Sequence, residues 1–241
     1  MSKTILITAG GTLEPIDRVR SITNTGTGKL GSLIADAFSE YEDTDRIFYV
    51  HAANACLPKT EKAVLCPIRS TDDLEKTVKE LCSKEHIDIV IHSMAVSDYR
   101  VRSVVEASAL ANTDLNEEEL LKLFDREDLN KKYNKLPSKL NSPVILLEPT
   151  PKIIPLFRSL LPEAVIVGFK LLDNVSHEEL INTALILLRK NGCSYVLAND
   201  YSTVEAGKHT GYLIDSSGNE NEFIGKQAIA EGIASVLLKG E

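Results

Sequence analysis

The sequence has few cysteines, no long apolar run and no block of basic residues, and each absence excludes a class of protein. Its cysteines, Cys56, Cys66, Cys82 and Cys193, form no C-x-x-C pair and have no metal-ligand spacing, which favours reduced thiols over disulfides or a zinc site. No apolar stretch approaches the length of a membrane span. Because the net charge is −8 and the basic residues are dispersed, neither nucleic acid nor a membrane is an expected partner.

Length and composition predict a globular protein. A chain of 241 residues, of which 43% are hydrophobic, is long enough for one large domain with a complete core. A strand pattern follows Met1 directly, so we expect no signal peptide. The protein is therefore expected to be soluble and cytoplasmic.

Apolar runs of strand length alternate with segments of helical periodicity. This alternation predicts an α/β fold with a mostly parallel central sheet and helices on both faces. The predicted strands cover 4–8, 46–51, 88–93, 164–169 and 194–198, and the predicted helices cover 29–40, 71–84, 150–160, 176–191 and 225–239.

Two segments interrupt this alternation within a single predicted domain, 1–241. Residues 99–149 are charged, polar and interrupted by prolines, which indicates an inserted flap with one helix at 113–126. Near the C-terminus, segments 211–215 and 220–224 flank a Ser-Ser-Gly-Asn turn, which predicts a β-hairpin.

Two glycine clusters lie within the first thirty residues. Gly10 and Gly11 follow the first predicted strand, and Gly26, Gly28 and Gly31 surround the start of the first predicted helix. Glycine turns at a helix start present bare backbone N–H groups to an anion, so both turns can converge on one phosphate-bearing ligand. Simple tight turns explain the glycines equally well.

The glycine spacing argues against two common nucleotide-binding motifs. The first strand is not followed by G-x-G-x-x-G, and no acidic residue closes the second strand, so a nicotinamide cofactor is weakly supported. No G-x-x-x-x-G-K-[ST] motif is present, which disfavours a P-loop kinase. An NAD(P)-dependent oxidoreductase and a non-enzymatic binding module remain as alternatives.

Small or polar residues follow three further predicted strands. They are the segments Ser93–Asp98, Gly168–Lys170 and Ala198–Asp200. In a parallel sheet such strand ends line one crevice, where Asp98 can bind a hydroxyl group or a metal ion. The residues alone thus predict an α/β domain that binds a phosphorylated small molecule.

Several segments, in order along the chain, resemble the phosphopantothenate–cysteine ligases (phosphopantothenoylcysteine synthetases) in their stand-alone bacterial form. The resemblance implies a Rossmann-like three-layer fold. The matching segments are ITAGGTLEPIDRVRSITNTGTGKLG (7–31), SMAVSDYRV (93–101), SKLNS (138–142), PTPKII (149–154), VGFKL (167–171) and LANDYS (197–202).

The resemblance implies a reaction of coenzyme A biosynthesis. Such ligases use CTP, in bacteria, and Mg²⁺ to convert 4′-phosphopantothenate into an acyl-cytidylate. L-cysteine then displaces CMP to give 4′-phosphopantothenoylcysteine, and pyrophosphate is the other product. An ATP-dependent version of the same reaction is the alternative. The family is dimeric, which implies a homodimer and a dimerisation role for 99–149.

The resemblance also implies roles for single residues. Asn24 corresponds to the asparagine that stabilises the acyl-nucleotidyl intermediate, and Lys139 to the first lysine of a basic K-x-K-K flap motif that here reads KLNS. A second helix lysine of the family is replaced by Ile186. The Mg²⁺ ligands are not identified. Implied nucleotide-binding residues are Ser93, Met94, Ala95, Asp98, Lys139, Pro151, Lys152, Ile153, Ile154, Phe169 and Lys190; implied substrate-binding residues are Gly10, Gly11, Thr12, Asn24, Thr25, Gly26, Thr27, Gly28 and Asn199.

Overall fold

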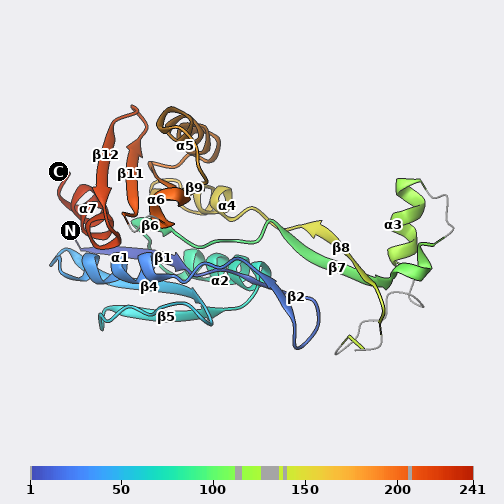
Figure 1. Cartoon of the computed structure of the whole chain (residues 1–241). Helices are drawn as coiled ribbons and strands as arrows, with labels where there is room; N and C mark the ends of the chain where they lie inside the picture. Colours follow the sequence, from blue (N-terminus) through green and yellow to red (C-terminus); the bar gives the residue numbers. More distant parts are fainter. Residues whose placement is uncertain (1, 112–115, 126–135, 138–139, 206–207, 241) are drawn as a thin grey trace.

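A twisted eight-stranded sheet forms the centre of the protein (Figure 1). The computed structural model describes residues 2–111, 116–125, 136–137, 140–205 and 208–240. The strand order is β12-β11-β10-β9-β6-β1-β4-β5, and all neighbours are parallel except in the C-terminal β10-β11-β12 meander. The strands are β1 (Lys3–Ala9), β4 (Thr44–Ala52), β5 (Ala63–Ile68), β6 (Ile89–His92), β9 (Val165–Leu172), β10 (Tyr195–Asp200), β11 (Thr210–Asp215) and β12 (Glu220–Ile224).

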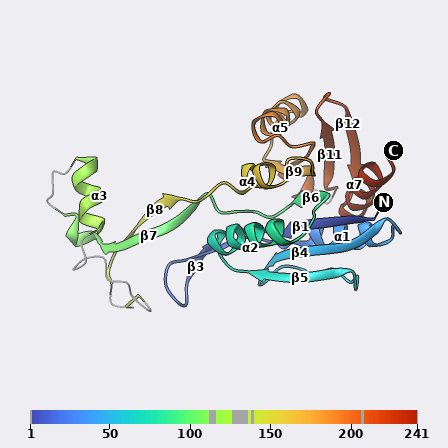
Figure 2. The ribbon, with the colours of Figure 1, turned by 180° about the vertical axis from the view of Figure 1, so that it is seen from behind.

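Helices cover both faces of this sheet, as Figures 1 and 2 show from opposite sides. Alternate strand residues bury toward each helix layer, so two apolar clusters form, one on each face. This confirms the predicted three-layer α/β fold. No helix in the described part of the chain is long and apolar enough to cross a membrane. One layer holds α1 (Lys29–Ser39) and α7 (Lys226–Lys239); the other holds α2 (Thr71–Lys84), α4 (Ile153–Leu160) and α5 (His177–Asn191).

All five predicted strands and the C-terminal hairpin are present, with small shifts at their ends. Helix α4 begins at Ile153 rather than at residue 150, because Pro151 disfavours helical backbone at the residue before it. The edge strand β5 and the short helix α6 (Tyr201–Glu205) were not predicted. Strand β5 contains Pro67, which is typical of an edge strand and weakens the strand signal, and it exposes Val64 and Leu65.

The segment predicted as an insertion contains a long two-stranded arm. Strands β7 (Tyr99–Glu106) and β8 (Pro143–Pro149) pair antiparallel and project away from the sheet, with a 3₁₀ turn (Ala107–Ala109) and α3 (Glu117–Asp125) beyond them (Figures 1 and 2). Helix α3 lies within the predicted span 113–126; positions 113–115 and 126 are outside the described residues. The pairing of the arm was not predicted.

The strand order reverses next to β1, and this reversal locates the site. From β1 the chain moves to β4 and β5 on one side, and afterwards to β6, β9 and β10 on the other. In open α/β sheets, ligands bind beyond the carboxyl ends of the strands at such a reversal. Between β1 and α1 the chain also forms a short hairpin, β2 (Leu13–Pro15) and β3 (Ser21–Thr23), directly before Asn24.

Candidate functional site

The two early glycine turns touch each other at the end of β1. Gly10 and Gly28 both have positive φ, 93° and 67°, and Gly28 is the N-cap of α1. A Cβ at Gly26 would lie 3.1 Å from the Gly10 carbonyl oxygen, and one at Gly28 would lie 3.1 Å from the Gly10 nitrogen. Glycine is therefore required for this close approach. The two turns are adjacent, as expected, and α1 begins at their junction without a side-chain cap at Gly28. That they bind one phosphate together stays a prediction.

The segment after β6 completes this junction. The Ala95 amide donates to the Gly10 carbonyl at 2.8 Å, and the Ala95 carbonyl accepts from the Thr12 amide at 3.2 Å. Asn24 is exposed, and among the described residues its side-chain amide makes only a long hydrogen bond, 3.4 Å, to the same Ala95 carbonyl. The amide of Asn24 is thus positioned at the junction and is accessible to a ligand. We name Gly10, Gly11, Asn24–Gly28 and Ala95 the glycine junction.

A pocket of about 590 Å³ lies beside the glycine junction, between α4, α5 and the ends of β6 and β9. This volume is within the usual range for small-molecule sites. The pocket brings together every implied nucleotide-binding residue except Ser93, Ala95 and Lys139. Those lining it are Met94, Asp98, Pro151, Lys152, Ile153, Ile154, Phe169 and Lys190.

The pocket combines apolar walls with cationic groups. Lys152, Lys170 and Lys190 all line it, and Lys152 pairs with Asp98 at 2.5 Å. The Asp98 and Lys152 side chains are 73% and 65% exposed, so a bound polyanion can compete for this lysine. Lys170 was not assigned from the sequence, although its position at the end of β9 marked it. Ile186 also lines the pocket, where the family resemblance implied a lysine.

The segment 93–96 forms the wall between the pocket and the glycine junction. Met94 and Val96 line the pocket, whereas Ala95 contacts the glycine turns. The Ser93 hydroxyl donates to the Thr8 carbonyl at 2.7 Å and lies against Gly31. Ser93 and Ala95 therefore belong to the α1 side of the sheet, and a nucleotide that contacts all four residues has to cross the sheet edge here.

Two of the implied substrate-binding residues are occupied by internal hydrogen bonds. The buried Thr12 hydroxyl accepts from the Ser97 amide at 2.9 Å and donates to the Ser97 hydroxyl at 3.1 Å. The buried Asn199 side chain donates to the Thr210 carbonyl at 3.0 Å, across the pairing of β10 with β11. These bonds give both side chains a structural role. Thr25 and Thr27, by contrast, are exposed beside the junction.

His92 lines the pocket but does not act as a titrating group near neutral pH. Its Nδ1 is 2.7 Å from the Thr8 hydroxyl, and its ring packs edge-on against Phe157, with centroids 5.4 Å apart. Burial lowers the pKa of His92 to about 4, so the ring is neutral. The contacts with Thr8 and Phe157 give His92 a structural role.

Asp98 is the carboxylate of the pocket that can take part in metal binding. The described residues contain no group of three or more His, Cys, Asp or Glu side chains that could hold a metal ion. Mg²⁺ in nucleotide sites needs only one or two carboxylates, with water and substrate phosphates as the remaining ligands. Asp98 together with a bound triphosphate fits this requirement. Lys139 lies outside the described residues.

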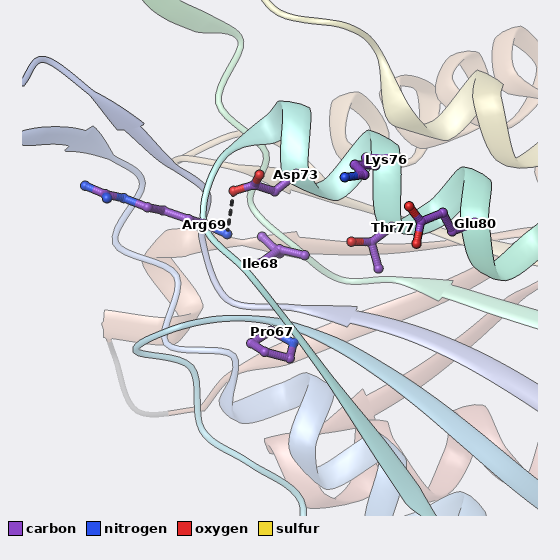
Figure 3. Close-up of a pocket in the computed structure, with 7 residues that line it drawn as sticks. All are labelled: Pro67, Ile68, Arg69, Asp73, Lys76, Thr77 and Glu80. Carbon is purple, nitrogen blue, oxygen red and sulfur yellow. Dashed lines mark hydrogen bonds between the residues drawn. The ribbon is translucent and has the colours of Figure 1, made fainter. Parts of the chain in front are cut away.

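A second hollow, about 530 Å³, runs along β5 and the first turns of α2 (Figure 3). It contains none of the predicted site residues. Asp73 in this hollow is already used, because its carboxylate accepts from the Arg69 and Ser70 amides at 3.2 and 3.0 Å in the capping box of α2. The remaining lining residues are Pro67, Ile68, Lys76, Thr77 and Glu80.

Comparison with known proteins agrees with this geometry. A family model described as "DNA/pantothenate metabolism flavoprotein C-terminal domain" matches residues 1–132, more than half of the chain. The chain belongs to this family. The matched part contains the glycine junction and the segment after β6.

Individual members of the DNA/pantothenate metabolism flavoprotein family extend the match over more of the chain. The coenzyme A biosynthesis bifunctional protein CoaBC of Thermococcus kodakarensis is 29% identical over 198 residues, or 82% of this chain and 41% of that protein. The chain thus spans about two-fifths of this relative's length.

Solved structures show the same fold over the whole chain. The DNA/pantothenate metabolism flavoprotein from Streptococcus pneumoniae superimposes with a TM-score of 0.88 at 29% identity, covering 100% of both chains. A Cab2 variant in complex with phosphopantothenate-cysteine has a TM-score of 0.66 at 19% identity, covering 96% of this chain and 83% of that one, and it shares the fold.

Proposed function

We propose that this chain is a phosphopantothenate–cysteine ligase of coenzyme A biosynthesis. It joins 4′-phosphopantothenate and L-cysteine through an acyl-cytidylate and releases CMP and pyrophosphate. The observation that carries the proposal is the meeting of the glycine junction with the lysine-rimmed pocket at the strand reversal. The family membership and the names of the relatives, which place CoaBC in coenzyme A biosynthesis and Cab2 in complex with phosphopantothenate-cysteine, support it.

The two halves of the site fit the two phosphorylated reactants. Backbone N–H groups at the glycine turns and at the start of α1 suit the phosphate of phosphopantothenate. The apolar walls of the pocket suit the cytosine base, while Lys152, Lys170 and Lys190 suit the triphosphate. The wall at 93–96 then separates the two ligands while allowing the carboxylate to reach the α-phosphorus.

In the first step the pantothenate carboxylate attacks the α-phosphorus of CTP, and the bond to the β-phosphate oxygen breaks. An anion has to approach a polyanion, so neutralisation of charge dominates the barrier. We assign this task to the pocket lysines and to Lys139. Asp98 would help to hold a Mg²⁺ ion, which would supply further positive charge.

In the second step the cysteine amine attacks the acyl carbon and loses a proton, and CMP leaves with the C–O bond electrons. Negative charge develops on the carbonyl oxygen during this attack. The accessible amide of Asn24 is positioned to donate a hydrogen bond there. Cys66, Cys82 and Cys193 take no part, because burial raises the pKa of each and leaves them as thiols.

A pyrophosphate-release assay tests the function and the choice of nucleotide. With phosphopantothenate, cysteine and Mg²⁺ present, we expect release with CTP and at least tenfold less with ATP. Pyrophosphate release with ATP but not with CTP would indicate the ATP-dependent reaction. Binding of phosphopantothenate without release of pyrophosphate would indicate a non-enzymatic binding module. Tight binding of NADPH in a fluorescence titration would indicate the oxidoreductase.

We further propose that the chain is a homodimer that pairs through the arm. One face of the β7–β8 ribbon exposes Tyr99, Ile145 and Leu147, which are 55%, 37% and 42% exposed. The opposite face of the ribbon carries ion pairs instead: Arg100 binds Glu148 at 2.7 Å and Asp72 at 2.8 Å. An exposed apolar ribbon that projects from the domain suits a second copy of the same chain (Figures 1 and 2).

Substitution Leu147→Asp is expected to convert the dimer into a monomer, because it places a charge in the apolar face. Sedimentation velocity at micromolar concentration measures the change. Ile224→Asp is the matched control, since Ile224 is 65% exposed on β12 and away from the arm. A monomeric wild-type protein, or a dimer unaffected by Leu147→Asp, would show that the arm is not the interface.

A further inference from the structure

The loop between β2 and β3 contains a carboxylate with no exposed side-chain surface. Asp17 has 0% side-chain exposure, and its Oδ1 accepts from the Val19 and Arg20 amides, both at 2.7 Å. These two bonds close the turn that leads through β3 to Asn24. A buried carboxylate requires such donors, because an unpaired buried charge is strongly destabilising.

The second oxygen of the Asp17 carboxylate bonds to a residue that is distant in the sequence. Oδ2 accepts from the Leu136 amide at 2.9 Å, across 119 positions of sequence. Leu136 belongs to the inserted segment and is itself 6% exposed. The Leu136 amide, with those of Val19 and Arg20, holds the pKa of Asp17 below its usual value although burial acts in the opposite direction. The carboxylate is therefore ionised at neutral pH and bonded to both segments at once.

We propose that Asp17 is a positioning residue that couples the turn before Asn24 to the inserted segment at Leu136. The coupling rests on the proposed function, since it links the substrate turn to the chain that leads, three positions further on, to the implied lysine Lys139. Asp17 itself touches neither reactant.

Because Oδ1 bonds to the turn and Oδ2 bonds to Leu136, the substitution Asp17→Asn can separate support of the turn from the link to Leu136. Asp17→Asn keeps an acceptor for the Val19 and Arg20 amides but presents a donor to the Leu136 amide. It should preserve the turn, while it removes the bond to Leu136 and the ion pair at 3.7 Å between the Arg20 guanidinium and the same Oδ2. Asp17→Ala removes both sets of bonds and should also loosen the turn.

Hydrogen exchange followed by mass spectrometry measures the link without requiring turnover. In the wild-type protein, we expect phosphopantothenate to slow exchange in peptides that contain residues 16–22 and in peptides that contain Leu136. In Asp17→Asn, protection at 16–22 should remain, while the ligand response at Leu136 is lost. An unchanged response at Leu136 in Asp17→Asn would overturn the proposal.

Kinetics supply the readout that a merely structural role would not change. For Asp17→Asn we expect the kcat of pyrophosphate release to fall at least tenfold, with the KM for CTP within twofold of wild type. Leu136→Pro removes the donor, so Asp17→Asn should cause no further loss in that background. Asp125→Asn, which breaks the Arg102–Asp125 ion pair within the arm, is the control and should retain kcat.

Failure of this proposal is distinguishable from failure of the proposed function. An active wild-type enzyme whose Asp17→Asn variant keeps kcat within twofold would refute the coupling alone. A wild-type protein that releases no pyrophosphate, yet shows the Asp17-dependent exchange response to phosphopantothenate, would refute the reaction and retain the coupling.

Discussion

Substitution Asn24→Asp is expected to lower turnover about 10²–10³-fold and to make the acyl-cytidylate accumulate. Asn24 is exposed at the glycine junction, and within the described part of the chain its amide has only the 3.4 Å bond to Ala95, so it can donate to a ligand. Aspartate lacks that donor and adds a negative charge where negative charge develops during attack by cysteine. Attack at phosphorus takes place away from this bond, so the intermediate still forms. Quenched-flow analysis with labelled CTP measures the accumulated species.

The matched control for this variant is Asn221→Asp, which makes the same chemical change at an exposed position on β12. It should leave turnover within twofold of wild type. Full turnover by Asn24→Asp, with no intermediate in the quenched samples, would remove Asn24 from the mechanism.

The sheet and its helices were predictable because their signals are local. Buried strands such as β1 and β9 are continuous apolar runs in the sequence. The start of α2 is marked by Ser70 and Asp73, which form its capping box. The edge strand β5 carries a weaker signal, because Pro67 interrupts its apolar run. The β7–β8 pairing joins segments about 40 positions apart, and no local pattern specifies it.

Within the site, the sequence indicated which residues meet but not which way their side chains face. Positions 93–95 were all assigned to nucleotide binding, yet alternate residues lie on opposite sides of the sheet edge. The role of Asn199 depends on its antiparallel neighbour β11, whose register no local pattern specifies. Lys170 was overlooked as a pocket residue because its side of the sheet depends on the packing of α4 and α5.

Substitution Gly11→Ala is expected to lower kcat/KM for phosphopantothenate about 100-fold, because a shift of about 1 Å in a binding group can cost that much. An added Cβ at Gly11 would lie 2.5 Å from the Asn24 carbonyl oxygen and 3.3 Å from its carbonyl carbon. Both are backbone atoms, so the methyl group can be accommodated only if the turn that carries Asn24 moves. Steady-state pyrophosphate release at saturating CTP measures the effect.

The control for Gly11→Ala has to separate displacement of the turn from general destabilisation. Gly218→Ala serves here, because Gly218 has φ of 85° in the C-terminal hairpin and no described atom within 4 Å of an added Cβ. Its backbone strain should cost about 1–2 kcal/mol of stability and leave kcat/KM unchanged. If Gly11→Ala retained wild-type kcat/KM, contact between the early turns would not determine the position of Asn24. If both variants lost activity in proportion to their thermal stability, the loss would reflect unfolding rather than displacement of the substrate turn.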